Sequence, residues 1–166
     1  MKPLTALFAA LLLLTLPAGA AHAQAQPHTE NTMQLVINGQ TFTVALANNA
    51  TAQAFAKQLP LILKMDDLHG NEKYHYLATP LPARPENPGR IQTGDLMLFG
   101  DDCIVLFYKD FHTRYRYTRI GRLHNPAGLA AAVGGDAITA QFRLDAANPG
   151  ELRPHSILPN QSGDET

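Results

Sequence analysis

Two apolar runs joined by a short polar turn are the most distinctive pattern in this chain. The runs cover residues 96–99 and 103–108, and Gly100-Asp101-Asp102 lies between them. Glycine and aspartate are common turn residues, so the pattern predicts a β-hairpin. Its strands are too hydrophobic to face water on both sides, which indicates a place in the core of a mainly β fold.

A second hairpin is predicted nearer the start of the chain. Residues 33–37 and 40–46 are rich in apolar side chains, and Asn38-Gly39 between them is typical of a type I′ turn. Such a turn needs positive φ at both central residues, which asparagine and glycine tolerate. Further strands are predicted over residues 61–65, 73–77 and 137–144, with a turn over 66–71.

Two short helices are also predicted. Residues 50–59 place apolar side chains at helical spacing, Asn48 or Asn49 can cap the start, and Pro60 ends the helix. The second helix covers residues 128–133, and its start and stop signals are Asn125, Pro126, Gly134 and Gly135.

Residues 80–89 hold four prolines and are therefore expected to form a surface loop, whereas residues 111–122 are predicted as a further strand. In total, the sequence predicts about eight short strands and two short helices. Tight turns between neighbouring strands imply antiparallel pairing. A closed antiparallel β-barrel hides the sheet edges most economically, and a two-sheet sandwich is the alternative.

The first residues have the pattern of a secretory signal peptide. An uncharged apolar run over residues 4–16 follows Lys2, and residues 21–23 form a small-x-small cleavage site before Gln24. The run is shorter than the roughly 20 residues that span a bilayer, so a membrane anchor is the less favoured alternative. We therefore expect a periplasmic or secreted protein without a stable membrane anchor. The expected organisation is a signal peptide over 1–23, a flexible leader over 24–32, the barrel domain over 33–144 and a disordered tail over 145–166.

The net charge and the single cysteine exclude some classes of partner and of covalent link. The chain has a formal net charge of −1 at pH 7, so a nucleic-acid partner is not expected. Cys103 is the only cysteine, and no internal disulfide can form. Its apolar neighbours predict a buried side chain, whereas a reactive thiol would need exposure and a nearby base.

The segment 109–122 holds the candidate binding residues. Its two alternating arginines and two tyrosines would face opposite sides of a strand, and Arg119 and Arg122 extend the positive stretch. Arginine forms bidentate pairs with carboxylates, so the segment can bind an anionic ligand or an acidic peptide. The alternative is a solvated strand face with the tyrosines packed inward. The predicted ligand-binding residues are His112, Arg114, Tyr115, Arg116 and Tyr117.

Other ionisable residues carry weaker signals. His69 and His75 lie across a turn with aspartates nearby, but without a cysteine partner or an HExxH pattern they are expected to be exposed loop residues. Asp95, Asp101 and Asp102 adjoin glycines and are predicted to form turns rather than an acid–base pair. No metal, cofactor or catalytic residue is therefore predicted.

Several short motifs together resemble one known family. The motifs are Ile37-Asn38-Gly39, Gly94-Asp95-Leu96, Leu106-Phe107-Tyr108 and Tyr117-Thr118-Arg119-Ile120-Gly121-Arg122-Leu123. In this order and spacing, over residues 33–144, the chain resembles the bacterial cyclophilin-like family. The resemblance implies a cyclophilin-like antiparallel barrel closed at its ends by two helices. Because the function of such domains is mostly undefined, it implies a fold more than an activity.

True cyclophilins are peptidyl-prolyl cis–trans isomerases, and this chain departs from their site motifs. Their site combines an arginine, a phenylalanine, a glutamine, a histidine and an apolar proline pocket, set in a Phe-His-Arg-Val context. Here Phe111-His112 is followed by Thr113-Arg114, so the arginine comes one place late, and the chain has no tryptophan. No isomerase residue is therefore carried over to this sequence.

These patterns favour an exported, non-catalytic binding module for a small molecule or an extended peptide. The alternative is a divergent prolyl isomerase that uses Arg114 or Arg116 beside a pocket wall of Phe111 or Phe107. A structural role in the cell envelope is a third hypothesis, which an exposed apolar patch of several hundred Å² would favour.

Overall fold

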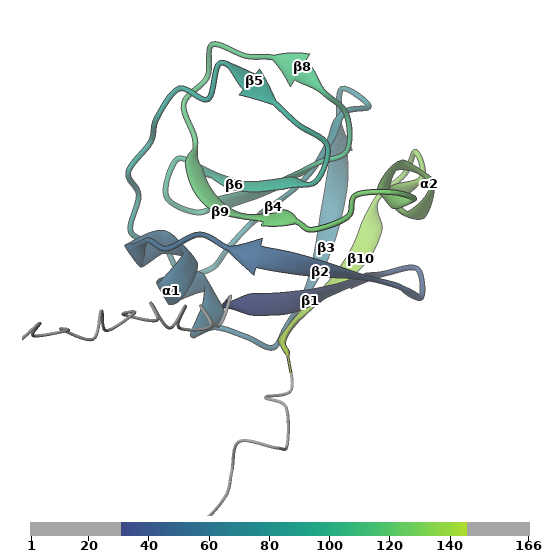
Figure 1. The fold of residues 1–166 in the computed structure, drawn as a ribbon, viewed down its shortest axis with the longest axis horizontal. Coiled ribbons are helices and arrows are strands. Elements are labelled where there is room, and N and C mark those ends of the chain that lie inside the picture. Colours follow the sequence, from purple (N-terminus) through teal and green to yellow (C-terminus); the bar gives the residue numbers. More distant parts are fainter. Residues whose placement is uncertain (1–30, 146–166) are drawn as a thin grey trace, which may run out of the picture.

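The computed structural model describes residues 31–145, which form a closed antiparallel barrel of eight strands with two short helices (Figure 1). The barrel strands are β1 (Thr32–Ile37), β2 (Gln40–Leu46), β3 (Leu61–Leu68), β4 (Glu72–Tyr76), β6 (Asp95–Phe99), β7 (Cys103–Phe107), β9 (Thr118–Leu123) and β10 (Ile138–Leu144). The helices are α1 (Ala50–Ala56) and α2 (Leu129–Val133). The predicted barrel is confirmed.

The strands follow the order β1-β10-β3-β4-β7-β6-β9-β2 around the barrel, and each neighbouring pair is antiparallel. Two further strands, β5 (Arg90–Ile91) and β8 (Phe111–His112), pair with each other in a separate small sheet. Figure 1 shows this small sheet set apart from β1 and β2. The closed circuit leaves no barrel strand with an unpaired edge.

The first hairpin forms as its sequence predicts. Asn38 and Gly39 have φ values of 48° and 79°, the left-handed region that a type I′ turn requires. This turn fixes the register of β1 and β2, in which Leu35 lies opposite Phe42. Both side chains are buried, because the register places apolar positions of both strands on the inner face.

Strand β7 is buried on both faces. Ile104 and Leu106 belong to the main core inside the barrel, whereas Cys103, Val105 and Phe107 belong to a second apolar cluster outside it. All five side chains of β7 are buried. The second cluster includes Ile91 and Tyr117, from the segments that cross the outer face of β6 and β7. The apolar runs of the hairpin are explained by these two cores.

Helix α1 begins as predicted and ends earlier. Asn49 caps it, accepting a hydrogen bond from the backbone N–H of Ala52 at 2.8 Å. The helix ends at Ala56 rather than at residue 59, and the following N–H groups of Gln58 and Leu59 bond to carbonyls three residues back. A residue before proline disfavours the helical conformation, which explains the early end before Pro60.

Helix α2 begins later in the chain than its predicted start signals indicate. Asn125 accepts a hydrogen bond from the N–H of Ala127 at 3.0 Å, so it forms a local turn rather than the helix cap. The cap position belongs to Gly128, whose φ of 83° is left-handed. The helix therefore begins only at Leu129, and the prediction that Asn125 and Pro126 start it is wrong.

Strand β3 is longer than the predicted strand over 61–65. It continues to Leu68, and the turn is made by His69 and Gly70, whose φ values are 52° and 64°. The extension places Asp67 opposite Lys73 of β4, with Asp67 Oδ1 2.8 Å from Lys73 Nζ. Lys73 is fully buried, and a buried lysine requires such a partner, so this ion pair favours the longer strand.

The predicted strand over 111–122 is two strands separated by a crossing segment. After β8, which lies outside the barrel, residues 113–117 lead the chain back to it, and Tyr117 pairs only with Glu86 through an isolated bridge. β9 then begins at Thr118, where pairing to β2 and β6 closes the barrel. The alternation of arginine and tyrosine at 114–117 therefore does not mark two faces of a strand, and that prediction is wrong.

The predicted signal peptide, most of the leader and most of the tail lie outside the described residues. At the edges of the described part, Thr32 already belongs to β1, and its hydroxyl donates a hydrogen bond to Asp145 at 2.5 Å. Gln34 also donates to Asp145. Among residues 31–145, neither helix has the length and apolar character needed to cross a membrane.

Candidate functional site

A groove with a volume of about 700 Å³ lies on the outer face of the barrel beside β4 and β7. Small-molecule sites usually occupy roughly 300–1,000 Å³, so the groove is large enough to hold a ligand. Its walls come from the end of β3, from β4 and β7, and from the crossing segment that follows β8.

The strand wall of the groove follows from the alternation of β4 and β7. Glu72, Tyr74 and Tyr76 are alternate residues of β4 and line the groove, so their side chains share one face. The matching residues of β7 are Cys103 and Val105, both buried. An acidic group and two tyrosines therefore lie in a row along the groove.

Aromatic contacts with the second apolar cluster hold the opposite wall of the groove in place. The ring of Phe107 lies 5.6 Å from that of Phe111 and 5.4 Å from that of Tyr117, measured between centroids. Tyr117 in turn contacts Phe99 at 5.6 Å, and Phe99 contacts Tyr115 at 6.1 Å. These edge-to-face and tilted contacts stabilise the crossing segment against the barrel.

Exposed apolar side chains gather at the groove. Among residues 31–145, six large hydrophobic side chains are exposed, and four of them line this groove. The four are Leu68, Tyr76, Phe99 and Tyr115, with exposures of 39%, 61%, 43% and 67%. Clustered exposed apolar groups of this kind are typical of binding surfaces.

Burial shifts the titration of groups in the groove. Desolvation raises the pKa of Glu72, and the electrostatic influence of nearby His69 partly offsets this rise. Burial also raises the pKa of Cys103 to about 11 and that of Tyr117 to about 12. The thiol and the phenol are therefore neutral at physiological pH, and the groove can offer a ligand aromatic surface together with a few polar contacts.

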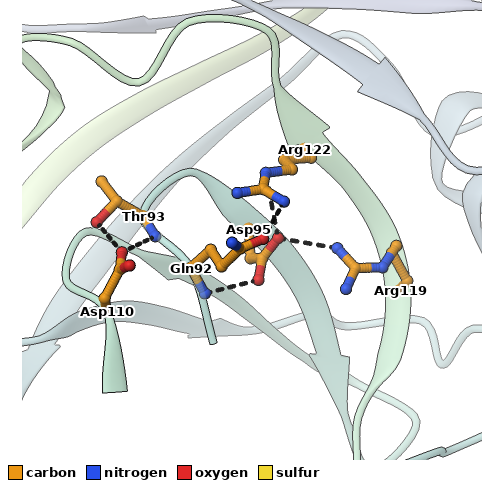
Figure 2. Close-up of polar contacts among 6 residues, drawn as sticks. All are labelled: Gln92, Thr93, Asp95, Asp110, Arg119 and Arg122. Atoms are coloured by element: carbon orange, nitrogen blue, oxygen red, sulfur yellow. Dashed lines mark hydrogen bonds and ion pairs between the residues drawn. The ribbon is translucent and has the colours of Figure 1, made fainter. Parts of the chain in front are cut away.

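A second hollow, of about 510 Å³, lies between α1 and the 82–88 loop, and Arg119 lines it. Arg119 donates a hydrogen bond to Asp95 at 2.8 Å, and Arg122 lies 3.7 Å from the same oxygen (Figure 2). The other Asp95 oxygen accepts from the backbone N–H of Gln92 at 2.9 Å. Asp95 thus forms the predicted turn and also a buried ion pair that the sequence did not reveal.

Figure 2 also shows the neighbouring Asp110, which accepts two hydrogen bonds from Thr93. Arg90 donates a third at 3.0 Å. The bonds from Thr93, helped by Arg90, lower the pKa of Asp110 to about 2. Together the two aspartates stabilise the segment that joins β5 to β6. Neither aspartate lines the groove.

Comparison with known proteins identifies the family. Residues 35–143 match the model of the Cyclophilin-like family. The chain belongs to this family. The solution structure of a hypothetical protein from Archaeoglobus fulgidus is similar, with a TM-score of 0.48 and 19% identity over 69% of this chain and 95% of that one. Among curated proteins none matches this chain. The resemblance to the cyclophilin-like family is confirmed.

Four of the five predicted binding residues line the groove of this cyclophilin-like barrel. These are His112, Arg114, Tyr115 and Tyr117. Arg116 lies elsewhere, because its guanidinium donates to the carbonyl oxygen of Pro85 at 2.6 Å. It therefore holds the proline-rich loop to the crossing segment. Of the two tyrosines, only Tyr117 packs inward, and Tyr115 stays exposed.

Sequence reasoning missed the strand wall of the groove. Asn71, Glu72, Tyr74 and Tyr76 all line it, although they lie about 40 residues before the predicted segment. The available signal was an acidic residue in alternation with two tyrosines, which is unusual for a strand face exposed only to water. Pairing of β4 with β7 brings this row to the crossing segment.

The two histidines weighed as metal ligands do not come together. His75 donates through Nδ1 to the carbonyl oxygen of Lys64 at 2.8 Å, whereas His69 lines the groove. Within the described part of the chain, no three histidine, cysteine, aspartate or glutamate side chains gather in a way that could hold a metal.

Proposed function

We propose that this chain is an exported cyclophilin-like protein whose groove binds a small molecule or an extended peptide without converting it. The observation that carries the proposal is the gathering of exposed aromatic side chains with Arg114 and His112 around one groove. Aromatic walls supply contact area at a low entropic cost, and the guanidinium supplies a carboxylate-binding group.

A thermal-shift screen of carboxylates, amines and extended peptides tests the binding role. A ligand present at 100 times its Kd stabilises the native state by about 2.7 kcal/mol, which raises the Tm measurably. We expect Arg114→Ala and Tyr115→Ala to abolish the shift. Arg116→Ala is the matched control, since Arg116 is held by Pro85 and does not line the groove. Equal losses in all three variants would contradict the proposal.

Export is tested separately by expression of the whole chain and fractionation of the cells. We expect the protein in the periplasm or medium, with Gln24 as its first residue after cleavage by signal peptidase. A product that keeps its original N-terminus and stays in the cytoplasm would overturn this part of the proposal.

Prolyl isomerisation is the second candidate function. Arg114 and Phe111 line the same apolar groove, which suits a proline ring, whereas Phe107 is fully buried and Arg116 points elsewhere. Uncatalysed isomerisation takes tens of seconds or longer, so a proline-peptide assay detects even weak catalysis. Turnover that Arg114→Ala abolishes and Arg116→Ala retains would favour the isomerase over the non-catalytic module.

A further inference from the structure

Glu72 is a largely buried residue whose carboxylate accepts no hydrogen bond. Its side chain lies in the groove and the residue is only 9% exposed. No side chain or backbone N–H within residues 31–145 donates a hydrogen bond to it, and its neighbour Lys73 is engaged instead by Asp67 and by the carbonyl of Asp136. The Glu72 oxygens are not among the fully buried atoms without a partner, so they are accessible from the groove and available to accept from a ligand.

Asn71 adds a second acceptor to the same groove. Its side-chain oxygen Oδ1 is buried and has no hydrogen-bond partner within the described part of the chain. Asn71 immediately precedes Glu72, and both residues line the groove. A buried polar group left without a partner destabilises the protein, and a donor from a ligand can offset this cost.

Aromatic rings complete the environment. Tyr74 and Tyr76 lie on the same face of β4 as Glu72, with their rings 5.9 Å apart and nearly perpendicular. The faces of such rings attract cations, and more so organic cations that also carry apolar surface. A single carboxylate among aromatic walls is a poor site for a hydrated metal ion, which takes several oxygen ligands.

We propose that Glu72 and Asn71 form the cation-recognising end of the groove, so that its ligand carries a protonated amine or a guanidinium next to an aromatic or apolar group. The proposal rests on the binding role given to the groove above and names the chemistry of the ligand. A free organic amine and the basic side chain of a peptide share this chemistry.

Three small probes that carry groups of different charge on the same phenylethyl unit test the proposal. Phenethylamine is cationic, 2-phenylethanol is neutral and 3-phenylpropionate is anionic, and each is titrated into the full chain while amide chemical shifts are followed by NMR. We expect phenethylamine to bind at least about tenfold more tightly than the alcohol, with shifts centred on β4, since a hydrogen bond between charged groups is stronger than one from a neutral hydroxyl.

Variants separate the two proposals. Glu72→Gln should remove the preference for the amine, whereas Glu86→Gln, the same change at an exposed residue outside this groove, should keep it. Equal binding of amine and alcohol in wild type, or a preference that survives Glu72→Gln, overturns the cation site and leaves groove binding intact. Binding of no probe at the groove overturns both.

Two capped dipeptides distinguish the sources of the cation. Acetyl-Phe-Lys-amide carries the ammonium on a peptide, and acetyl-Phe-norleucine-amide has the same carbon chain without the charged nitrogen. Preference for the lysine peptide over phenethylamine identifies a basic peptide as the ligand class, and the reverse order identifies a free amine. If neither the lysine peptide nor phenethylamine binds better than its neutral counterpart, the cation site is overturned.

Discussion

Arg119 and Asp95 are joined across β9 and β6 by a hydrogen bond of 2.8 Å, in which the aspartate side chain is 1% exposed and the arginine side chain 45% exposed (Figure 2). Arg122 reaches the same carboxylate, although residues three apart on a regular strand face opposite sides. A β-bulge resolves this, because Leu96 lies opposite Gly121 and Met97 opposite Arg119, which leaves Ile120 as the extra residue. The bulge thus brings both arginines to one buried acid.

Loss of the Asp95 carboxylate should destabilise the barrel more than loss of a surface pair. We expect Asp95→Ala to lower the free energy of unfolding by about 2 kcal/mol, because hydrogen bonds to charged groups contribute roughly 1.5–3 kcal/mol and the half-exposed arginines regain water. Urea denaturation measures the change. Arg90→Ala is the control, since it removes the exposed pair with Asp110 and should cost less than about 1 kcal/mol. Equal losses would contradict a special role for Asp95.

Gly121 next to the bulge should not accept a side chain. A Cβ at this position would lie 2.5 Å from the carbonyl oxygen of Ala45 and 3.0 Å from Val44 Cγ1, both on the paired strand β2. Because backbone would have to move, we expect Gly121→Ala to cost at least about 2 kcal/mol, measured as a lower urea midpoint. Gly135→Ala is the control, since nothing lies within 4 Å of its Cβ position. A Gly121→Ala midpoint within error of wild type would show that β2 and β9 can separate freely.

The fold was predictable because its signals are local. Turn chemistry at Asn38-Gly39 and two-sided apolar runs at β6 and β7 set strands and hairpins without knowledge of distant contacts. Errors occurred where a distant partner decides the conformation. Lys73 extends β3 by its ion pair with Asp67, and residues 113–117 lie outside the barrel because β9 begins to pair only at Thr118.

The candidate site was predictable on one wall only. The four predicted residues, from the end of β8 and the crossing segment, are close in sequence, so their basic and aromatic character was visible as a cluster. Glu72 and Asn71 reach the same groove through the antiparallel pairing of β4 and β7, in which Glu72 lies opposite Phe107. A single sequence does not reveal which strands pair, because many apolar strands could fill the same place in a barrel.

Cys103 on the groove floor should react slowly with thiol reagents. Burial raises its pKa from 9.0 to about 11, so at pH 8 the thiolate fraction is about a hundredfold below that of the unfolded chain. Labelling with a disulfide reagent, followed by absorbance, should be slow in buffer and fast in guanidinium chloride. Native labelling as fast as that of the unfolded protein would mean that the thiol is not buried as the structure places it.

Glu72 should lower the stability of the protein at neutral pH. Desolvation raises the pKa of the folded-state carboxyl above its ordinary value of 4.5, so folding favours the protonated form. Below pH 4.5 the carboxyl is protonated in both states and costs nothing, but stability is lost as the pH rises through the folded pKa. We therefore expect Glu72→Gln to raise the Tm at pH 7.5.

The pH dependence separates this effect from a general change in packing. By differential scanning calorimetry, the Tm difference between Glu72→Gln and wild type should shrink as the pH falls and vanish near pH 4. A difference of the same size at both pH values would indicate repacking instead of charge. We expect Glu72→Gln to be more stable at neutral pH and also to lose the preference for phenethylamine. This combination is typical of a residue that serves binding and lowers the stability of the fold. A purely structural glutamate would instead destabilise the protein when it is replaced.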